Sequence, residues 1–474
     1  MIFCLSESLE EEWPPIKERP RQEGLVRRVL IANRGEIALR AVRTCRQLGL
    51  QSVAVYSSAD GNSPHRWAAD HSVCIGPPPP KASYLNAAAL IEVASACQCD
   101  ALYPGYGFLA ENSDFAARCE EAGLIFIGPS AEVIARMGDK VAARRTAAAL
   151  GIPVVPGSKE GFTSAAEAKK HAEAIGYPLL LKASAGGGGR GMRVAADAGV
   201  FTALFEQAST EAAAAFGRPD VYLERFFPKV RHIEIQVFGD RHGNYAQLGE
   251  RDCSVQRRHQ KLVEEAPSPV LDRSARRAMA DAALTLIRDL NYVNAGTVEF
   301  IYEAESQNFF FIEMNTRIQV EHPVTEMVTG NDLVAEQFRV AAGERLSVVP
   351  AAADAPVAIE FRINAEDAEH DFRPSPGMLK RWRPPSGRDI RLDSHVYENY
   401  VVPPYYDSML GKLIVTGRDR AAAIETAASA LARFDVSGIA TTVPFHADLL
   451  RRPEFGRAQI HTRWVEDRMR TAVH

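Results

Sequence analysis

The sequence predicts a chain of several domains that combines α/β and α+β architecture and begins with a parallel sheet. Three observations predict this class. Short β-type runs alternate with helical patterns over residues 25–139. A glycine-rich loop at 184–192 follows a further apolar run, and two later apolar runs each contain an acid. A proline-bearing stretch at 349–356 precedes a final mixed region, and 474 residues exceed the size of one simple core.

The first region predicts a doubly wound unit. Residues 26–32 form an apolar run, residues 36–48 carry apolar side chains at helical spacing, and residues 52–56 form another apolar run. Strand, helix and strand in this order indicate a parallel pair with a right-handed crossover. Further strands are expected at 101–103 and 124–127. The unit is Rossmann-like, but its first turn, 33–35, has one glycine rather than three, so dinucleotide binding is not favoured.

The remaining elements follow from the same patterns. A helix is expected to begin near 137–140 and to run to Leu150, and a strand at 177–183 leads into the glycine-rich loop. Further strands of the middle region are expected at 221–224, 232–238, 297–302 and 309–314. In the last region we expect strands at 358–363 and 412–416 and a helix at 421–434.

Composition restricts the possible functions. Apolar residues make up 46% of the chain and charged residues 24%, which is typical of an ordinary globular enzyme. A net charge of −5 gives no overall attraction to nucleic acid or to an anionic membrane, and no apolar run approaches the roughly 20 residues that span a bilayer. The seven scattered cysteines indicate reduced thiols and a cytoplasmic location. Residues 1–24 lack the features of a secretory signal and are expected to form a disordered extension.

The glycine-rich loop is a candidate phosphate-binding lid. Its backbone N–H groups can approach phosphate oxygens closely, and Lys140 and Lys182 on either side of it can offset phosphate charge. It is not a Walker A loop, because no Gly-Lys-Ser/Thr sequence follows. The alternative is a flexible linker with solvated lysines. The glycines concerned are Gly186, Gly187, Gly188, Gly189 and Gly191.

Two acids interrupt apolar strands. Glu299 lies within 297–302 and Glu313 within 309–314, and Asn315 follows the second strand. Ionised groups are costly among apolar residues unless they are paired or bind a metal. The oxygen donors therefore indicate a Mg²⁺ site that bridges nucleotide phosphates; strand-end salt bridges are the alternative.

A third group of polar residues follows. Arg317, Gln319 and Glu321 alternate, so in an extended segment their side chains would face one pocket. Such a set can hold a small planar oxyanion and remove a proton from it. Upstream, the segment 256–261 adds further donors and cations. A solvated charged face is the alternative, but the proximity to the predicted metal acids favours a site.

Together these motifs resemble biotin carboxylases, members of the ATP-grasp superfamily, over residues 26–463. The resemblance rests on the glycine-rich loop and on segments 31–38, 104–109, 137–140, 250–254, 313–317, 362–367 and 403–408. One departure lies at 224–227, which reads Glu-Arg-Phe-Phe where the family often has Glu-Lys-Tyr-Leu. Backbone contacts to the nucleotide are expected to survive it.

The resemblance implies a role for each candidate residue. ATP phosphates would be bound by Lys140, Lys182 and the loop glycines. The nucleotide pocket would be lined by Glu224, Arg225, Phe227, His232, Gln256 and His259. Glu299, Glu313 and Asn315 would hold Mg²⁺ or Mn²⁺. Bicarbonate would be bound by Lys261, Arg317, Gln319 and the backbone of Val320. Glu321 would be the general base, and Arg362 would stabilise the enolate-like oxygen of deprotonated biotin.

The resemblance also implies a layout and partners. The expected domains are an N-terminal domain at 25–139, an ATP-grasp domain at 140–348 with a mobile lid at about 155–228, and a C-terminal domain at 357–465. The expected reaction is ATP- and bicarbonate-dependent carboxylation of biotin through carboxyphosphate. The alternatives are another ATP-grasp carboxylate–amine ligase and a catalytically idle paralogue.

No Ala-Met-Lys-Met biotinylation sequence is present. The expected partners are therefore a biotin carboxyl carrier protein and carboxyltransferase subunits, as in an acetyl-CoA carboxylase of fatty acid biosynthesis or a carboxylase of another acyl-CoA. The resemblance also implies a homodimer.

Overall fold

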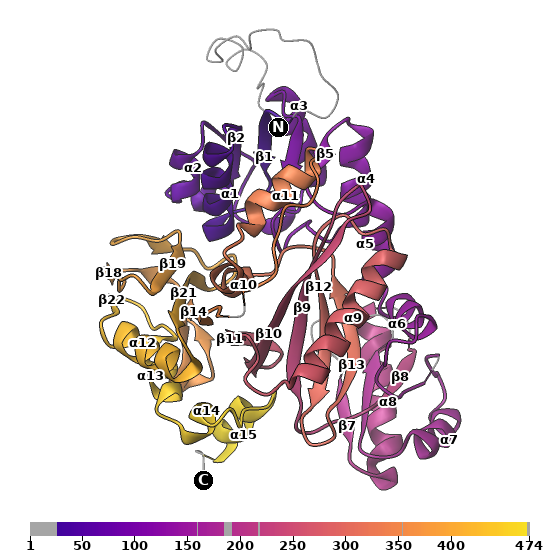
Figure 1. The fold of residues 1–474 in the computed structure, drawn as a ribbon. Coiled ribbons are helices and arrows are strands. Elements are labelled where there is room, and N and C mark those ends of the chain that lie inside the picture. The colour runs from indigo at the N-terminus through magenta and orange to yellow at the C-terminus, as the bar shows by residue number, and fades with distance from the viewer. Residues whose placement is uncertain (1–25, 159, 184–191, 217–218, 353, 472–474) are drawn as a thin grey trace.

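The computed structural model describes residues 26–471 except 159, 184–191, 217–218 and 353. The predicted disordered extension at 1–24 and the loop glycines Gly186–Gly191 therefore lie outside the described residues. The described chain forms three regions around a central sheet (Figure 1). None of its helices is long and apolar enough to cross a membrane.

The first region contains the predicted parallel sheet. Its strands pair in the order β3-β2-β1-β4-β5, all parallel, which is the order of the first five strands of a Rossmann fold. The strands are β1 (Arg28–Ile31), β2 (Gln51–Tyr56), β3 (His71–Cys74), β4 (Ala101–Tyr103) and β5 (Ile125–Phe126). The helices are α1 (Gly35–Gln47), α2 (Pro64–Ala68), α3 (Ala87–Ala96), α4 (Ser113–Glu121) and α5 (Ala131–Gly138).

A smaller unit follows, beside the central sheet (Figure 1). Its helix α6 begins at Lys140, because Asp139 Oδ1 accepts the backbone N–H groups of Val141 and Ala142 at 2.9 Å each and ends α5. Three strands pair in the order β7-β6-β8. The elements are α6 (Lys140–Ala149), α7 (Ala165–Ile175), β6 (Leu179–Ala183), β7 (Arg193–Ala195), α8 (Ala198–Phe216) and β8 (Val221–Arg225).

The central sheet has eight strands in the order β13-β12-β9-β10-β11-β14-β21-β19, and every pair is antiparallel. Its first five strands and their helices are β9 (Arg231–Gly239), β10 (Tyr245–Arg257), β11 (Gln260–Ala266), α9 (Arg273–Asp289), β12 (Asn294–Glu303), β13 (Asn308–Asn315), α10 (His322–Thr329) and α11 (Leu333–Ala341). Helix α9 packs against β9, β10 and β13. The β10–β11 hairpin was not among the strands that the sequence predicted.

The last region extends the same sheet across the predicted boundary at 349–356. β14 pairs with β11, from Val263 opposite Phe361 to Ala266 opposite Ala358. The larger elements are β14 (Val357–Asn364), β19 (Ile390–Ser394), β21 (Met409–Gly417), α12 (Arg420–Ala432), α13 (Val443–Leu450), α14 (Pro453–Gly456) and α15 (Trp464–Thr471). Short paired strands complete it: β15 (Glu366–Asp367), β16 (Arg373–Pro374), β17 (Gly377–Met378), β18 (Arg381–Arg383), β20 (Val401–Val402) and β22 (Asp435–Ser437).

The candidate active site

The centre of the site is Lys261, near the start of β11. Its Nζ contacts three carboxylates, at 2.6 Å from Glu234, 2.9 Å from Glu299 and 2.7 Å from Glu321. These acids come from β9, from β12 and from the turn before α10, so the lysine joins three segments that are distant in sequence. Burial alone would lower the pKa of Lys261, but the three carboxylates outweigh it and hold that pKa well above its usual value.

Glu299 joins the predicted metal residues to the predicted bicarbonate residues. Its carboxylate accepts hydrogen bonds from Asn315 Nδ2 at 2.9 Å and from Gln319 Nε2 at 3.1 Å, and lies 3.0 Å from His232 Nε2. Burial would raise the pKa of Glu299, but Lys261 and His232 hold it well below the usual range. The acid is therefore ionised, as a metal ligand has to be.

Arg317 lies beside this group. Its guanidinium donates to Gln319 Oε1 at 2.8 Å and to Asn315 Oδ1 at 3.2 Å. From the first region, Glu111 Oε2 accepts from Arg317 Nε at 2.8 Å, and Glu111 Oε1 accepts the backbone N–H of Thr316 at 3.1 Å. The N-terminal sheet therefore contributes a carboxylate that fixes the orientation of this arginine.

Glu321 lies at the inner end of the site. Arg362 donates to it from Nη2 at 2.9 Å and contacts Glu264 from Nε at 2.6 Å. Burial would raise the pKa of Glu321, but Lys261, Arg362 and Arg251 hold it far below the usual value. Glu321 is therefore ionised, and its strength as a base depends on how closely these cations stay engaged with it.

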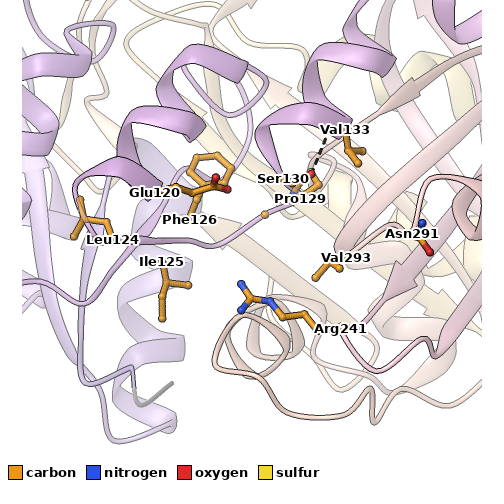
Figure 2. A pocket seen from close by; sticks show the side chains of 12 residues that line it. Glu120, Leu124, Ile125, Phe126, Pro129, Ser130, Val133, Arg241, Asn291 and Val293 are labelled. Atoms are coloured by element: carbon orange, nitrogen blue, oxygen red, sulfur yellow. Dashed lines mark hydrogen bonds between the residues drawn. The ribbon is translucent and has the colours of Figure 1, made fainter. Parts of the chain in front are cut away.

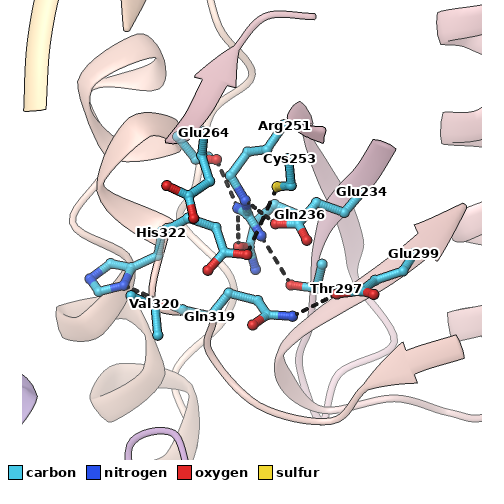
Figure 3. A network of polar contacts seen from close by, with 12 residues as sticks. Glu234, Gln236, Arg251, Cys253, Glu264, Thr297, Glu299, Gln319, Val320 and His322 are labelled. Carbon is cyan, nitrogen blue, oxygen red and sulfur yellow. Dashed lines mark hydrogen bonds and ion pairs between the residues drawn. The ribbon is translucent and has the colours of Figure 1, made fainter. Parts of the chain in front are cut away.

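The segment that carries these residues is not extended, contrary to the prediction. Residues 316–317 form a bend and 320–321 a turn, and Glu321 is the N-cap residue of α10. Arg317, Gln319 and Glu321 nevertheless reach one network, because the turn rather than strand alternation brings them together. Figure 3 shows Gln319 of this segment pointing toward Glu299. The carbonyl of Val320 accepts a hydrogen bond from Lys412 Nζ at 2.9 Å, and this bond holds the turn in place.

The predicted metal residues fit a divalent cation. Glu299 and Glu313 are Cα partners on β12 and β13. Asn315 lies beside them: its Nδ2 donates to Glu299 at 2.9 Å, and its Oδ1, the atom that could bind a metal, accepts from Arg317 at 3.2 Å. Carboxylate and amide oxygens are the ligands that Mg²⁺ prefers. The ligating atoms of His232, Glu234 and Glu299 also lie within 4.8 Å of one another, but there the Lys261 ammonium already supplies a positive charge to both acids.

The predicted phosphate cations lie toward β8 and β13. Lys140 Nζ is 2.8 Å from Glu313, and Lys182 pairs with Glu224, which Arg144 also contacts at 2.8 Å. Burial would lower the pKa of Lys140, but Glu313 outweighs it and the pKa is raised. Lys140 therefore remains charged beside Glu313.

The residues predicted to line the nucleotide pocket lie on several separate elements. His259 lies in the turn of the β10–β11 hairpin with φ +64°, and Gln256 is buried near the end of β10. Phe227 stacks on Phe310 with ring centroids 5.1 Å apart. The Arg225 guanidinium donates to the carbonyl of Ile175 at 3.2 Å, so its side chain contacts α7 rather than the network around Lys261.

Several residues of the network were not predicted. Arg251 is fully buried, contacts Glu234 and donates to Gln236 at 2.7 Å (Figure 3). It also donates to Thr325 at 2.9 Å. The remaining unpredicted members are Glu111, Cys253, Glu264 and Lys412. The alternation of His232, Glu234 and Gln236 in one strand was a signal that could have identified Glu234 and Gln236.

A cavity of about 410 Å³ lies elsewhere, between the N-terminal region and the loop after β9 (Figure 2). Phe126, Ser130 and Asn291 line it, and the Arg241 side chain faces into it. None of the predicted site residues lines this cavity.

A parallel sheet, a small three-stranded unit beside an antiparallel sheet, and acids next to lysines define an ATP-dependent ligase of the ATP-grasp class. Three family models match: "Biotin carboxylase, N-terminal domain" at 25–134, "Carbamoyl-phosphate synthase L chain, ATP binding domain" at 139–349 and "Biotin carboxylase C-terminal domain" at 360–467. The chain is 50% identical over 443 residues to "Biotin carboxylase 1" of Bacillus subtilis, covering 93% of this chain and 98% of the relative. The chain belongs to the biotin carboxylase family.

Other relatives act in different carboxylases. A pyruvate carboxylase subunit from Methanothermobacter thermautotrophicus is 48% identical, covering 93% of this chain and 89% of the relative. Among solved structures, the biotin carboxylase domain dimer of the Hydrogenobacter thermophilus 2-oxoglutarate carboxylase, with MgADP, ADP and bicarbonate, has a TM-score of 0.88 and 45% identity. It covers 94% of this chain and 98% of that one. Biotin carboxylase from Campylobacter jejuni also has a TM-score of 0.88, at 44% identity, covering 94% of this chain and 99% of that one.

Proposed function

We propose that this chain carboxylates biotin with ATP and bicarbonate, and that the network around Lys261 is where bicarbonate is bound and deprotonated. The observation that carries the proposal is the convergence of Lys261, Arg317, Gln319 and Glu321. Two cations, an amide and an ionised carboxylate meet in one buried network. Such a set suits a small oxyanion that has one proton to lose.

Lys261 and Arg317 hold the bicarbonate, and Gln319 and the Val320 backbone orient it. Glu321 then removes its proton. When a cation binds the negative charge of bicarbonate, it interacts less strongly with Glu321. The pKa of Glu321 then rises, so this carboxylate becomes a stronger base once the substrate is bound. The base and the binding cations are therefore coupled.

ATP binds between Lys140 and Lys182, with the loop Gly186–Gly191 as a lid over its phosphates. The nucleotide itself lies against Glu224, Arg225, Phe227, His232, Gln256 and His259. Magnesium or manganese held by Glu299, Glu313 and Asn315 supplies charge neutralisation at the transferred phosphoryl group. The two lysines add the same kind of stabilisation and orient the phosphates for attack by the deprotonated bicarbonate.

Arg362 takes part in the second step. Carboxyphosphate breaks down to CO₂ and phosphate, phosphate takes the ureido proton of biotin, and the developing oxyanion is stabilised by Arg362. The buried ion pairs of Arg362 with Glu264 and Glu321 support this role, since they hold the guanidinium in one orientation. A carboxylate–amine ligase is not favoured by the relatives.

We further propose a cytoplasmic enzyme that works as a homodimer with a biotin carboxyl carrier protein and carboxyltransferase subunits. The six described cysteines are free, which suits a reducing compartment. An acetyl-CoA carboxylase of fatty acid biosynthesis is one setting. The chain is also similar to components of pyruvate and 2-oxoglutarate carboxylases. The molecule that finally accepts the carboxyl group is therefore determined by the carboxyltransferase partner and not by this chain.

The test of the function is ADP release with and without bicarbonate and free biotin. We expect ADP release to require bicarbonate and to accelerate with biotin, with one carboxybiotin formed per ADP. Release that ignores bicarbonate but responds to an amine would contradict the proposal.

A further inference from the structure

Two buried acids lie close to Arg362. Glu264 on β11 and Glu360 on β14 are Cα partners in the antiparallel ladder, and neither side chain is exposed. Cross-strand partners present their side chains on the same face of a sheet. Two carboxylates in this arrangement repel each other, and more strongly away from water.

The two acids differ in their partners. Glu264 Oε1 accepts from Arg362 Nε at 2.6 Å, while its Oε2 has no hydrogen-bond partner among the described residues. Neither oxygen of Glu360 has one within the same part of the chain. An ionised carboxylate without donors and without water is so costly that the group keeps its proton instead.

Among the described residues, the cations nearest to Glu360 are already paired with other groups. Lys412 on β21 is committed to Glu36 Oε1 at 2.9 Å and to the carbonyl of Val320 at 2.9 Å. Arg362, two residues along β14, is shared between Glu264 and Glu321.

Helix α10 packs against β14, and none of its residues, 322–329, all of which the structure describes, is a lysine or an arginine. Its Glu326 pairs with Arg40 at 3.0 Å and with Arg391 at 2.7 Å. Burial, together with the charges of Lys412 and the two arginines, lowers the pKa of His322, so this side chain is neutral.

The charge balance agrees with this geometry. Burial raises the pKa of Glu360 well above its usual value; Lys412 and Arg362 oppose this, while Glu264 and Glu321 add to it. Burial also raises the pKa of Glu264, to about 7, against the opposing charge of Arg362. Above neutral pH, Glu264 is therefore the ionised member of the pair and Glu360 the protonated one.

We propose that Glu360 is a neutral carboxylic acid in the working enzyme, so that Glu264 and Glu360 together place a single negative charge close to Arg362. Glu264 is then a positioning residue, which holds the Arg362 guanidinium so that Nη2 reaches Glu321. Because Glu360 is protonated, it adds no further negative charge close to Arg362. A further carboxylate charge would weaken the attraction of Arg362 for an oxyanion. The functional part rests on the role proposed above for Arg362 in biotin binding.

The first test measures the proton directly. Infrared spectra of the full chain at about pH 8 are expected to show the C=O stretch of a protonated carboxylic acid that Glu360→Gln removes. Glu36, another buried acid whose pKa burial raises, contributes to both spectra and cancels in the difference. Absence of the band in the wild type, or its persistence in Glu360→Gln, overturns the proposal. Should that variant not fold, Glu360→Asp, which keeps a carboxyl group at this position, replaces it: the C=O band is expected to shift in Glu360→Asp, while the contribution of Glu36 cancels in the difference, and an unshifted band overturns the proposal.

The second test separates positioning from general structural damage. For Glu264→Gln, we expect the biotin-dependent step to fall about tenfold further than bicarbonate-dependent ADP release measured without biotin, because one charged hydrogen bond to Arg362 is lost. Glu264→Asp, which keeps the charge, is expected to recover part of that loss. Equal losses in both reactions, or no loss in either, would overturn the positioning role.

The two tests also distinguish this inference from the function it rests on. If Arg362 does not act on biotin, Arg362→Ala spares biotin carboxylation while the infrared band of Glu360 remains. If the pair carries no proton, the band is missing while Arg362→Ala still loses the biotin step.

Discussion

The bicarbonate end and the phosphate end of the proposed site are built differently. At the bicarbonate end, the Lys261 side chain is 12% exposed and contacts three carboxylates. At the phosphate end, the Lys140 and Lys182 side chains are 56% and 30% exposed, and each pairs with one carboxylate. The bicarbonate end is therefore fixed before the substrate binds, whereas the lysines of the phosphate end can exchange one partner for another at a low cost in free energy.

The difference comes from the elements that carry the lysines. Lys261 lies on β11, which is paired on both sides within the eight-stranded sheet. Lys140 is the first residue of α6, and Lys182 lies on the three-stranded sheet that is paired separately from the central one. A small substrate that must lose a proton requires fixed geometry, whereas a flexible triphosphate is better bound by groups that adjust. Substitutions should therefore cost most at the bicarbonate end.

The largest effect is expected for Glu321→Gln. Removing the general base should reduce bicarbonate-dependent ADP release by about 10²–10⁴-fold, because base catalysis typically contributes that much. ATP affinity, measured by fluorescent nucleotide displacement, should change little. The exposed Glu305→Gln is a matched control. Turnover close to that of the control would remove Glu321 from the mechanism.

Arg362→Ala comes next. We expect biotin carboxylation to fall by about 10²–10³-fold through loss of oxyanion stabilisation, while bicarbonate-dependent ADP release persists in part. Arg362→Lys keeps the positive charge but removes the planar guanidinium that contacts both Glu264 and Glu321. Comparing it with Arg362→Ala separates the effect of the charge from the effect of these two contacts. Unimpaired formation of carboxybiotin by Arg362→Ala would contradict the assignment.

A smaller effect is expected for Lys182→Met at the phosphate end. The KM for ATP should rise about tenfold through loss of one charged contact with phosphate, with the KM for bicarbonate nearly constant. Lys170→Met, an exposed lysine of α7, is the control. If the KM for bicarbonate rose as much as that for ATP, the two ends would not be separable as described.

The smallest effect is expected for Glu111→Gln. Its ion pair with Arg317 joins the N-terminal sheet to the bicarbonate end, but the Glu111 side chain is 39% exposed. Partly exposed pairs contribute about 1 kcal/mol or less, so the KM for bicarbonate should rise about two- to fivefold, and less at high salt. A loss as large as that of Glu321→Gln would place Glu111 in the chemistry itself.

The sequence predicted four of the five strands of the parallel sheet, because these four are short continuous apolar runs. It missed β3, His71–Cys74, which is an edge strand without such a run. It did not predict the β10–β11 hairpin. These strands bury polar side chains such as Arg251 and Gln256, and they turn at Arg258 and His259, which have positive φ without being glycine or asparagine. A hydrophobic pattern cannot reveal strands whose buried face is charged.

The same limit applies to the site. Residues within recognisable motifs, such as Glu299, Asn315 and Glu321, were identified from the sequence and meet in the structure. Glu264 and Lys412 were not, because the role of each depends on a partner that lies far away in the sequence. Charge pairing across a sheet depends on register, which a single sequence does not specify.

The ladder between β11 and β14 has a consequence for dissecting the enzyme. Cutting the chain near residue 350 would leave β11 as an open edge, with unpaired N–H and C=O groups ready to recruit a foreign strand. The amino-terminal fragment would also lose Arg362 and Lys412. Such a fragment should aggregate rather than act as a smaller bicarbonate-activating catalyst. The last quarter of the chain therefore has to be expressed and engineered together with the rest.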